Sequence, residues 1–211
     1  MGNRVQTRLK VSQKHHAVLW PHKKLSHKQR EFFAKPQRYT SKVSNFGQQL
    51  KAYQTLRMLY GSMTKSQLKT TYAQARASQG RPGDMLLSLL ERRLDMVLYR
   101  ASFATSVYEA RQLVAHNHVL LNGVYTKNAS TLLKSGDVLS CDSTVHTKIL
   151  EKMVEKQTLH QDEQALKEWP QMNEHLEINY ANGTCVLLYA PQYVDFPCQV
   201  RVDRVLQALE S

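Results

Sequence analysis

Histidine and cysteine are the residues of this sequence best suited to catalysis or metal binding, and their spacing favours neither role. Cys141, Cys185 and Cys198 form no CxxC pair and show no spacing typical of metal ligands. We expect buried thiols in a reducing compartment, not a disulfide framework or a zinc site. His116 and His118 could form a catalytic or metal-binding pair, but no third ligand or nucleophile lies near them. We therefore predict no catalytic residue, no metal and no cofactor.

Arginine offers a different chemistry, which is the binding of phosphate. A guanidinium group can hold a phosphate through two parallel hydrogen bonds, which fixes an angle as well as a charge. Arg93, Arg100 and Arg111 are placed so that neighbouring helices of one unit would carry them. The alternative for Arg93 and Arg111 is a structural ion pair with Asp95 or Glu109. Further side chains could add hydrogen bonds: Gln112, His116, His118 and Asn122.

The distribution of charge indicates the kind of partner. The 211 residues carry 29 Lys and Arg against 17 Asp and Glu, a net charge of +12. Residues 1–83 hold 17 basic residues and one acid, Glu31, whereas residues 146–211 hold six basic and ten acidic residues. Such an excess and such segregation favour a polyanionic partner over a device for solubility. No apolar run approaches the roughly 20 residues that cross a bilayer, so we expect nucleic acid and no membrane.

The N-terminal part predicts a basic arm and then a helix. Residues 1–46 show no lasting apolar period, and Pro21 and Pro36 would interrupt a long helix. We expect a mostly irregular arm that becomes ordered against its partner. Residues 48–60 have the apolar periodicity of a helix, and Gly61 is a plausible stop.

A second basic helix is expected to begin at Thr64, where Gln67 completes a capping box. Three cations and an aromatic recur at the spacing of one helical face: Lys65, Lys69, Tyr72 and Arg76. Residues 32–83 contain no Asp or Glu that could neutralise them. We therefore favour phosphate contact over an ordinary solvated face, and we count Arg57 of the preceding helix among the candidate cations.

Two further helices are predicted in the middle of the chain. Asp84 is expected to cap a helix over residues 85–102. Ser106 and Glu109 form a second capping box, which begins a helix over residues 107–115.

The apolar period then changes to that of strands. Asn122-Gly123 between short apolar runs is a strong hairpin signal, and residues 134–137 predict a turn before another strand. Residues 85–141 are therefore expected to form a compact unit of two helices packed on a small sheet.

The C-terminal part predicts a helix over 147–168, a second hairpin over 175–189 and a strand over 200–205. The fold class is α+β, with a helical basic N-terminal domain, an inserted two-helix and small-sheet domain, and a C-terminal hairpin. The expected divisions are a basic arm over 1–46, a helical part over 47–83, a nucleic-acid-binding domain over 84–145 and a C-terminal region over 146–211.

Several stretches of this sequence carry a specific similarity to one family. They include residues 44–50 (SNFGQQL), 90–103 (LERRLDMVLYRASF), 109–123 (EARQLVAHNHVLLNG) and 136–138 (GDV). The pattern resembles the small-subunit ribosomal protein four family over nearly the whole chain. In that family the second and third stretches are the RNA-binding helices and a hairpin.

The resemblance implies early binding to a multi-helix junction of small-subunit ribosomal RNA, a role in assembly and translation, and contact with neighbouring small-subunit ribosomal proteins. It also implies a position on the side of the ribosome where messenger RNA enters, which makes messenger RNA a further expected partner. Residues 34–42 lack the family's Gly-Gln-His-Gly element, and the zinc-binding cysteines of some relatives are absent. The resemblance adds candidate RNA-binding residues by position: Arg8, Lys10, Ser44, Asn45, Gln49 and Arg92.

Two alternatives belong to other functional classes. The same RNA module is appended to pseudouridine synthases and some aminoacyl-tRNA synthetases, but about 70 residues follow Cys141 and they offer no catalytic constellation, because Asp195 and Asp203 stand alone. A turnover assay on RNA fragments would reveal such an enzyme. An RNA-binding regulator that works off the ribosome would be separated by sedimentation.

The sequence resembles the alphaproteobacterial and mitochondrial branch of the family, and its start lies close to the family start, without room for a long transit peptide. We expect a mitochondrial small ribosomal subunit, with the bacterial cytoplasm as the alternative.

Overall fold

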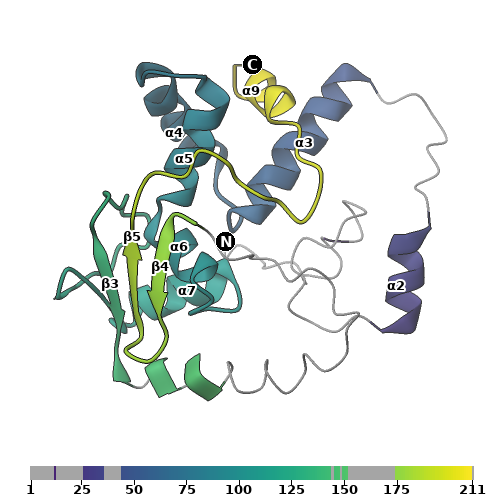
Figure 1. Ribbon diagram of the computed structural model, residues 1–211. Coiled ribbons are helices and arrows are strands. Elements are labelled where there is room, and N and C mark those ends of the chain that lie inside the picture. Colours follow the sequence, from purple (N-terminus) through teal and green to yellow (C-terminus); the bar gives the residue numbers. More distant parts are fainter. Residues whose placement is uncertain are drawn as a thin grey trace. The chain divides into compact units, whose positions relative to one another are not determined.

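The computed structural model describes Ser12 and residues 26–35, 44–143, 145–147, 149–151 and 174–210 (Figure 1). The chain divides into two compact units, one formed by residues 1–72 with 195–211 and the other by residues 73–194. The first unit is therefore discontinuous in sequence, and the second is inserted into it.

The first unit is helical. It contains α2 (His27–Ala34), α3 (Asn45–Leu59) and α9 (Val202–Glu210), and α4 (Lys65–Ala77) begins in it. Helix α9 lies beside α3 (Figure 1), with Gln49 Nε2 donating to Gln207 Oε1 at 3.2 Å. Within the mostly irregular arm expected over 1–46, α2 is a helix, and most of that arm lies outside the described residues. The strand expected over 200–205 is wrong. The last segment is a helix because Val205 and Leu209, four residues apart, are buried together.

The second unit packs helices against one face of an antiparallel sheet (Figure 1). The sheet order is β2-β1-β3-β5-β4, so that the C-terminal hairpin extends the central sheet through the pairing of β3 with β5. The core contains Leu98, Phe103, Val114 and Leu139. The elements are α5 (Pro82–Glu91), α6 (Leu94–Arg100), α7 (Val107–Ala115), β1 (Val119–Leu121), β2 (Val124–Tyr125), β3 (Val138–Cys141), β4 (Leu176–Asn179) and β5 (Thr184–Leu187).

The predicted hairpin turn between β1 and β2 is confirmed. Asn122 and Gly123 both have positive φ, 50° and 81°. Two successive positive values are what a type I′ turn requires, which is why Asn-Gly is favoured there. The second predicted hairpin is also confirmed, as β4 and β5.

The single helix expected over 85–102 is wrong, because the chain is extended at Arg93 between α5 and α6. Arg93 has φ −67° and ψ 141° and forms a β-bridge with Leu132. The backbone N–H of Leu94 donates to the Thr131 carbonyl at 2.9 Å, and that of Leu133 donates to the Arg92 carbonyl at 2.9 Å. Residues 131–133 therefore make backbone hydrogen bonds with Arg92 and Leu94 in place of those that a continuous helix would have made.

Two of the three predicted helix N-caps are confirmed. Thr64 and Gln67 exchange hydrogen bonds of 3.0 and 3.3 Å, and the Ser106 hydroxyl accepts from the Glu109 N–H at 3.2 Å. Asp84 is not the cap of α5, since Pro82 already occupies its first position and Asp84 lies in the first turn. Of the helix expected over 147–168, residues 147 and 149–151 are helical, and residues 148 and 152–168 lie outside the described residues.

Candidate RNA-binding surface

Arg100 is buried and holds a carboxylate. Its Nε and Nη2 donate to the two carboxylate oxygens of Glu91, each at 2.8 Å, and both side chains are at most 2% exposed. Helix α6 places Arg100 in its last turn and α5 places Glu91 in its last residue, so the pair joins two elements on either side of the break. This arrangement is structural.

Arg93 and Arg111 meet at one buried carboxylate. Asp95 is fully buried and accepts from Arg93 Nε and Nη2 at 3.0 and 2.8 Å and from Arg111 Nε at 2.7 Å. Arg93 also donates to the Ser130 hydroxyl at 3.0 Å. The Arg93 side chain is 8% exposed, whereas that of Arg111 is 30% exposed. Asp95 therefore orients Arg111, whose side chain remains partly exposed.

The accessibility expected of Arg93 and Arg100 is thus corrected. A continuous helix would place Arg93 and Arg100, seven residues apart, on one face, but the break at Arg93 interrupts that helix, and both side chains are enclosed in ion pairs. For Arg93 and Arg111 the ion-pair alternative with Asp95 is confirmed. The burial of Arg93 and Arg100 moves the candidate surface to Arg111 and to residues further along α7.

The structure brings together three of the predicted hydrogen-bonding residues. Gln112, His116 and His118 line a depression of about 230 Å³ at the C-terminal end of α7. The two imidazole rings are parallel within 9°, with centroids 6.4 Å apart. Gln112 and His116 are exposed, and His118 is partly exposed.

Asn122 lies apart from this depression and has a structural role. Its side-chain amide donates to Asp137 Oδ1 at 3.0 Å, and its Oδ1 accepts from the Val138 N–H at 2.9 Å. The hydrogen bond from Asn122, followed by that from the Lys134 backbone, holds the pKa of Asp137 below its ordinary value of 3.8. Asn122 thus connects two turns of the sheet, although its position is exposed.

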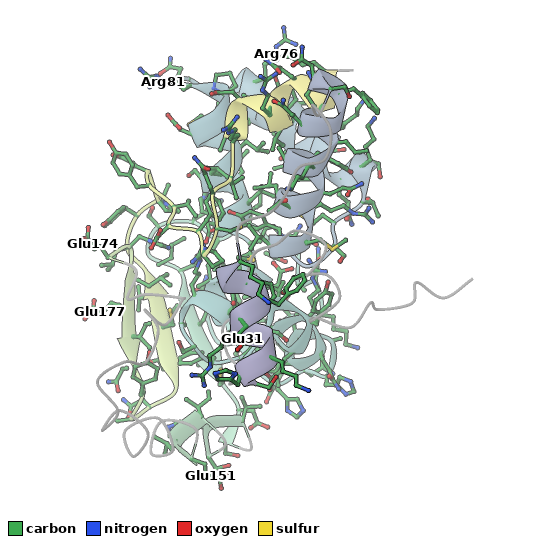
Figure 2. All side chains as sticks on the ribbon, turned by 90° about the vertical axis from the view of Figure 1, so that its right-hand side faces the viewer. Glu31, Arg76, Arg81, Glu151, Glu174 and Glu177 are labelled. Atoms are coloured by element: carbon green, nitrogen blue, oxygen red, sulfur yellow. The ribbon has the colours of Figure 1, made fainter. Side chains whose placement is uncertain are left out.

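The predicted cations of α4 are exposed: Lys65, Lys69 and Arg76. Tyr72 is corrected, because it is only 8% exposed and its hydroxyl donates to Glu210 Oε1 at 2.6 Å. Arg76 and Arg81 both project outward where α4 ends and α5 begins (Figure 2). Arg81 is absent from the predicted contacts, although its place directly after a basic helix was an available signal.

The remaining candidates have mixed roles. The Ser44 hydroxyl caps α3 by accepting from the Gly47 N–H at 3.2 Å, and Asn45 is exposed at the first position of that helix. Gln49 is bound to α9, as described above, and the partly buried Arg57 donates from Nε to the Met63 carbonyl. Arg92 is partly buried and donates from Nε to the Leu133 carbonyl at 2.8 Å. Arg8 and Lys10 lie outside the described residues.

The cysteines are thiols that burial makes unreactive. Burial is the main cause that raises the pKa of Cys141 and Cys185 to about 12 and that of Cys198 to about 11. Within the described ranges no three His, Cys, Asp or Glu side chains gather as metal ligands would. Among the helices that the structure describes, none combines the length and apolar character of a membrane span.

Comparison with known proteins defines the class. Residues 92–139 match the S4 domain, and residues 4–91 match the ribosomal protein S4/S9 N-terminal domain. The helices and hairpin around the depression therefore belong to an S4 domain, in a ribosomal protein whose second matching region precedes it.

The relatives define the family. Small ribosomal subunit protein uS4 of Sphingopyxis alaskensis is 34% identical over 209 residues, which cover 98% of each chain. The uS4 protein of Novosphingobium aromaticivorans is 42% identical over 142 residues, or 66% of this chain and 70% of the relative. Small ribosomal subunit protein uS4m of Reclinomonas americana is 34% identical over 165 residues, or 77% of this chain and 64% of the relative. The chain belongs to the small ribosomal subunit protein uS4 family.

Proposed function

We propose that this chain is a structural, non-enzymatic constituent of a small ribosomal subunit and that it binds the RNA of that subunit during assembly. The similarity to a uS4 relative over almost its entire length carries the proposal. The charge supports it, because the +12 excess lies wholly in the N-terminal two-fifths of the sequence. The RNA site proposed for it is a multi-helix junction.

Folded RNA presents phosphates and 2′-hydroxyls in a shallow minor groove and hides its deep major groove. A protein that binds such a surface needs spaced cations and polar groups on rigid elements. Helix α4 offers Lys65, Lys69 and Arg76 in exposed positions, and α7 offers the partly exposed Arg111, which Asp95 holds in place. Bound arginines and lysines would displace counterions, which is the main source of affinity in such complexes.

The partners beyond ribosomal RNA are inferred from charge and family. Neighbouring small-subunit ribosomal proteins are expected at the acidic C-terminal region. Glu174 and Glu177 project from the β4 side of the second unit, and Glu151 from its helical segment, away from Arg76 and Arg81 (Figure 2). Messenger RNA at its site of entrance to the ribosome is a further proposed partner. The compartment we propose is the mitochondrion, with the bacterial cytoplasm as the alternative that the alphaproteobacterial relatives support.

Sedimentation of a lysate from the source cells tests this function. The chain should migrate with the small subunit in a sucrose gradient at moderate salt and should remain with it after a wash that strips loosely bound proteins. A chain found only in the light fractions would be a regulator that acts off the ribosome. Fractionation of organelles from the same cells would decide between the two compartments.

A further inference from the structure

The depression at the end of α7 has an apolar floor and a polar rim. Phe103, Val145 and Ile149 are at most 4% exposed and form the buried part of its lining. Gln112, the two histidines and the partly exposed Glu109 form its polar rim. The volume of about 230 Å³ equals that of roughly eight water molecules.

The backbone that carries His116 and His118 is fixed by the C-terminal cap of α7. His116 is the C-cap of α7, and Asn117 then adopts φ 59° in the left-handed region. The N–H groups of Asn117 and His118 donate to the carbonyls of Val114 and Leu113 at 3.1 and 3.0 Å. These bonds close the helix in the manner of a Schellman motif. The motif therefore fixes the backbone positions from which the His116 and His118 side chains extend.

We propose that this depression binds one unpaired base of the RNA, stacked against the imidazoles of His116 and His118. Imidazole is one of the rings on which unstacked RNA bases lie in protein complexes. Because the two imidazole rings are parallel within 9°, one planar base can lie parallel to both of them. The inference rests on the proposed function, which supplies the RNA.

The local charge favours a base over a phosphate. Glu109 lines the depression, and Asp142 Oδ2 lies 3.7 Å from His118 Nδ1. The Glu109 carboxylate accepts from the Thr105 N–H at 2.6 Å, which draws it toward the start of α7. Two carboxylates would repel a phosphate at this place, whereas a neutral base carries no charge to repel.

Gln112 supplies a polar group for the edge of the base. It is exposed on the rim, and an amide offers both donors and an acceptor. Hydrogen bonds to the Watson–Crick edge are the usual companion of stacking when single-stranded RNA is recognised. Gln112 would therefore contribute to the choice of base, and the histidines to the strength of binding.

Three pairs of substitutions in the full-length chain separate stacking from charge. The probe is small-subunit ribosomal RNA transcribed from the genome that encodes the chain, and the readout is the dissociation constant. His116→Ala with His118→Ala should weaken binding about 5- to 150-fold. The Phe pair, which keeps rings without a titratable nitrogen, should stay within about threefold of the natural chain. The Lys pair, which keeps a cation without a ring, should bind as weakly as the Ala pair.

Controls keep the outcome decisive. Circular dichroism and thermal melting must show that each pair is folded. Gln112→Ala should weaken binding, and Gln192→Ala, which removes an exposed amide elsewhere in the same unit, is its matched control. Ultraviolet irradiation of the natural complex, followed by mass spectrometry, should give a nucleotide adduct within residues 112–118. Binding restored by Lys but not by Phe would overturn the inference in favour of a phosphate contact. Natural affinity of the Ala pair, or an adduct-free segment, would also overturn it while leaving the proposed function intact.

Discussion

Arg93, Arg100 and Arg111 show that an arginine in a basic protein is not by itself an RNA contact. Residue type and spacing made all three candidates for phosphate contact, with an ion-pair alternative for Arg93 and Arg111. Two of them, Arg93 and Arg100, are enclosed in buried ion pairs, and only Arg111 retains a 30% exposed side chain. The acids that decide this are Glu91 and Asp95, which were visible in the sequence next to the arginines. Their pairing depends on a helix break that no Gly or Pro announces.

Removal of Arg100 tests the structural role of the buried pair. Arg100→Met should remove the two hydrogen bonds and the positive charge that Arg100 supplies to the buried Glu91 carboxylate, which costs about 3–5 kcal/mol of unfolding free energy. Urea unfolding measures the difference. The exposed Arg81→Met is the matched control and should change the free energy by less than about 0.5 kcal/mol. Equal effects of the two substitutions would contradict a buried pair.

His175 predicts a pH dependence of stability. It is 6% exposed, its Nε2 has no hydrogen-bond partner among the described residues, and burial lowers its pKa below 6.5. The nearby Glu91 opposes the shift and Arg100 adds to it, so burial prevails. Below pH 6.5 His175 binds a proton more readily in the unfolded chain than in the folded chain, so the free energy of unfolding should fall.

The measurement is the free energy of unfolding of the natural chain and of His175→Phe between neutral pH and about pH 5. The variant should lose less stability across this interval because it has no proton to take up when unfolded. The ring contact with Tyr189, at 6.4 Å between centroids, is one that Phe can keep. Parallel curves for the two proteins would show that His175 is not the titrating group.

At the scale of elements, the exposed face of α4 should set part of the salt dependence. Lys65→Gln, Lys69→Gln and Arg76→Gln together should lower the log–log salt slope of RNA binding by up to about 0.7–0.9 per cation that meets a phosphate. The charge-preserving set Lys65→Arg, Lys69→Arg and Arg76→Lys should keep the slope. An unchanged slope in the Gln set would remove α4 from the RNA surface. The measurement is a filter-binding titration at several salt concentrations.

Elements that depend on residues close in sequence were predictable, whereas elements that depend on residues far away in sequence were not. The Thr64 cap and the Asn122-Gly123 turn depend on residues within a few positions, and both are confirmed. The break at Arg93 depends on residues 129–133, which lie some 40 positions away and are unremarkable in sequence. Helix α9 was mistaken for a strand because its valines have high strand propensity, and packing in the first unit overrides it.

The candidate site also combines features set by nearby residues, which were predictable, with features set by distant residues, which were not. The face of α4 and the position of Gln112 on α7 follow from helical spacing within one element. The gathering of Gln112, His116 and His118 around Phe103 and Ile149 needs segments from distant parts of the chain, so sequence periodicity could not reveal it.

For the whole molecule, charge and connectivity are organised along the sequence. Residues 1–83 carry 17 of the 29 basic residues, and the balanced second unit interrupts the helical first unit. Segments from both ends of the chain thus form one unit, while the S4 domain lies wholly within the other. The central physical claim is that cations mounted on these folded elements neutralise the backbone of structured RNA.

The salt dependence of binding by the full chain tests that claim most directly. The dissociation constant for small-subunit ribosomal RNA should rise as a power of salt concentration, with an exponent of about 0.7–0.9 for each phosphate neutralised. With six to ten such contacts the affinity would fall by about a thousandfold or more between roughly 50 and 200 mM salt. An affinity that stays constant from dilute buffer to about 1 M salt, where charges are screened within about 3 Å, would contradict it.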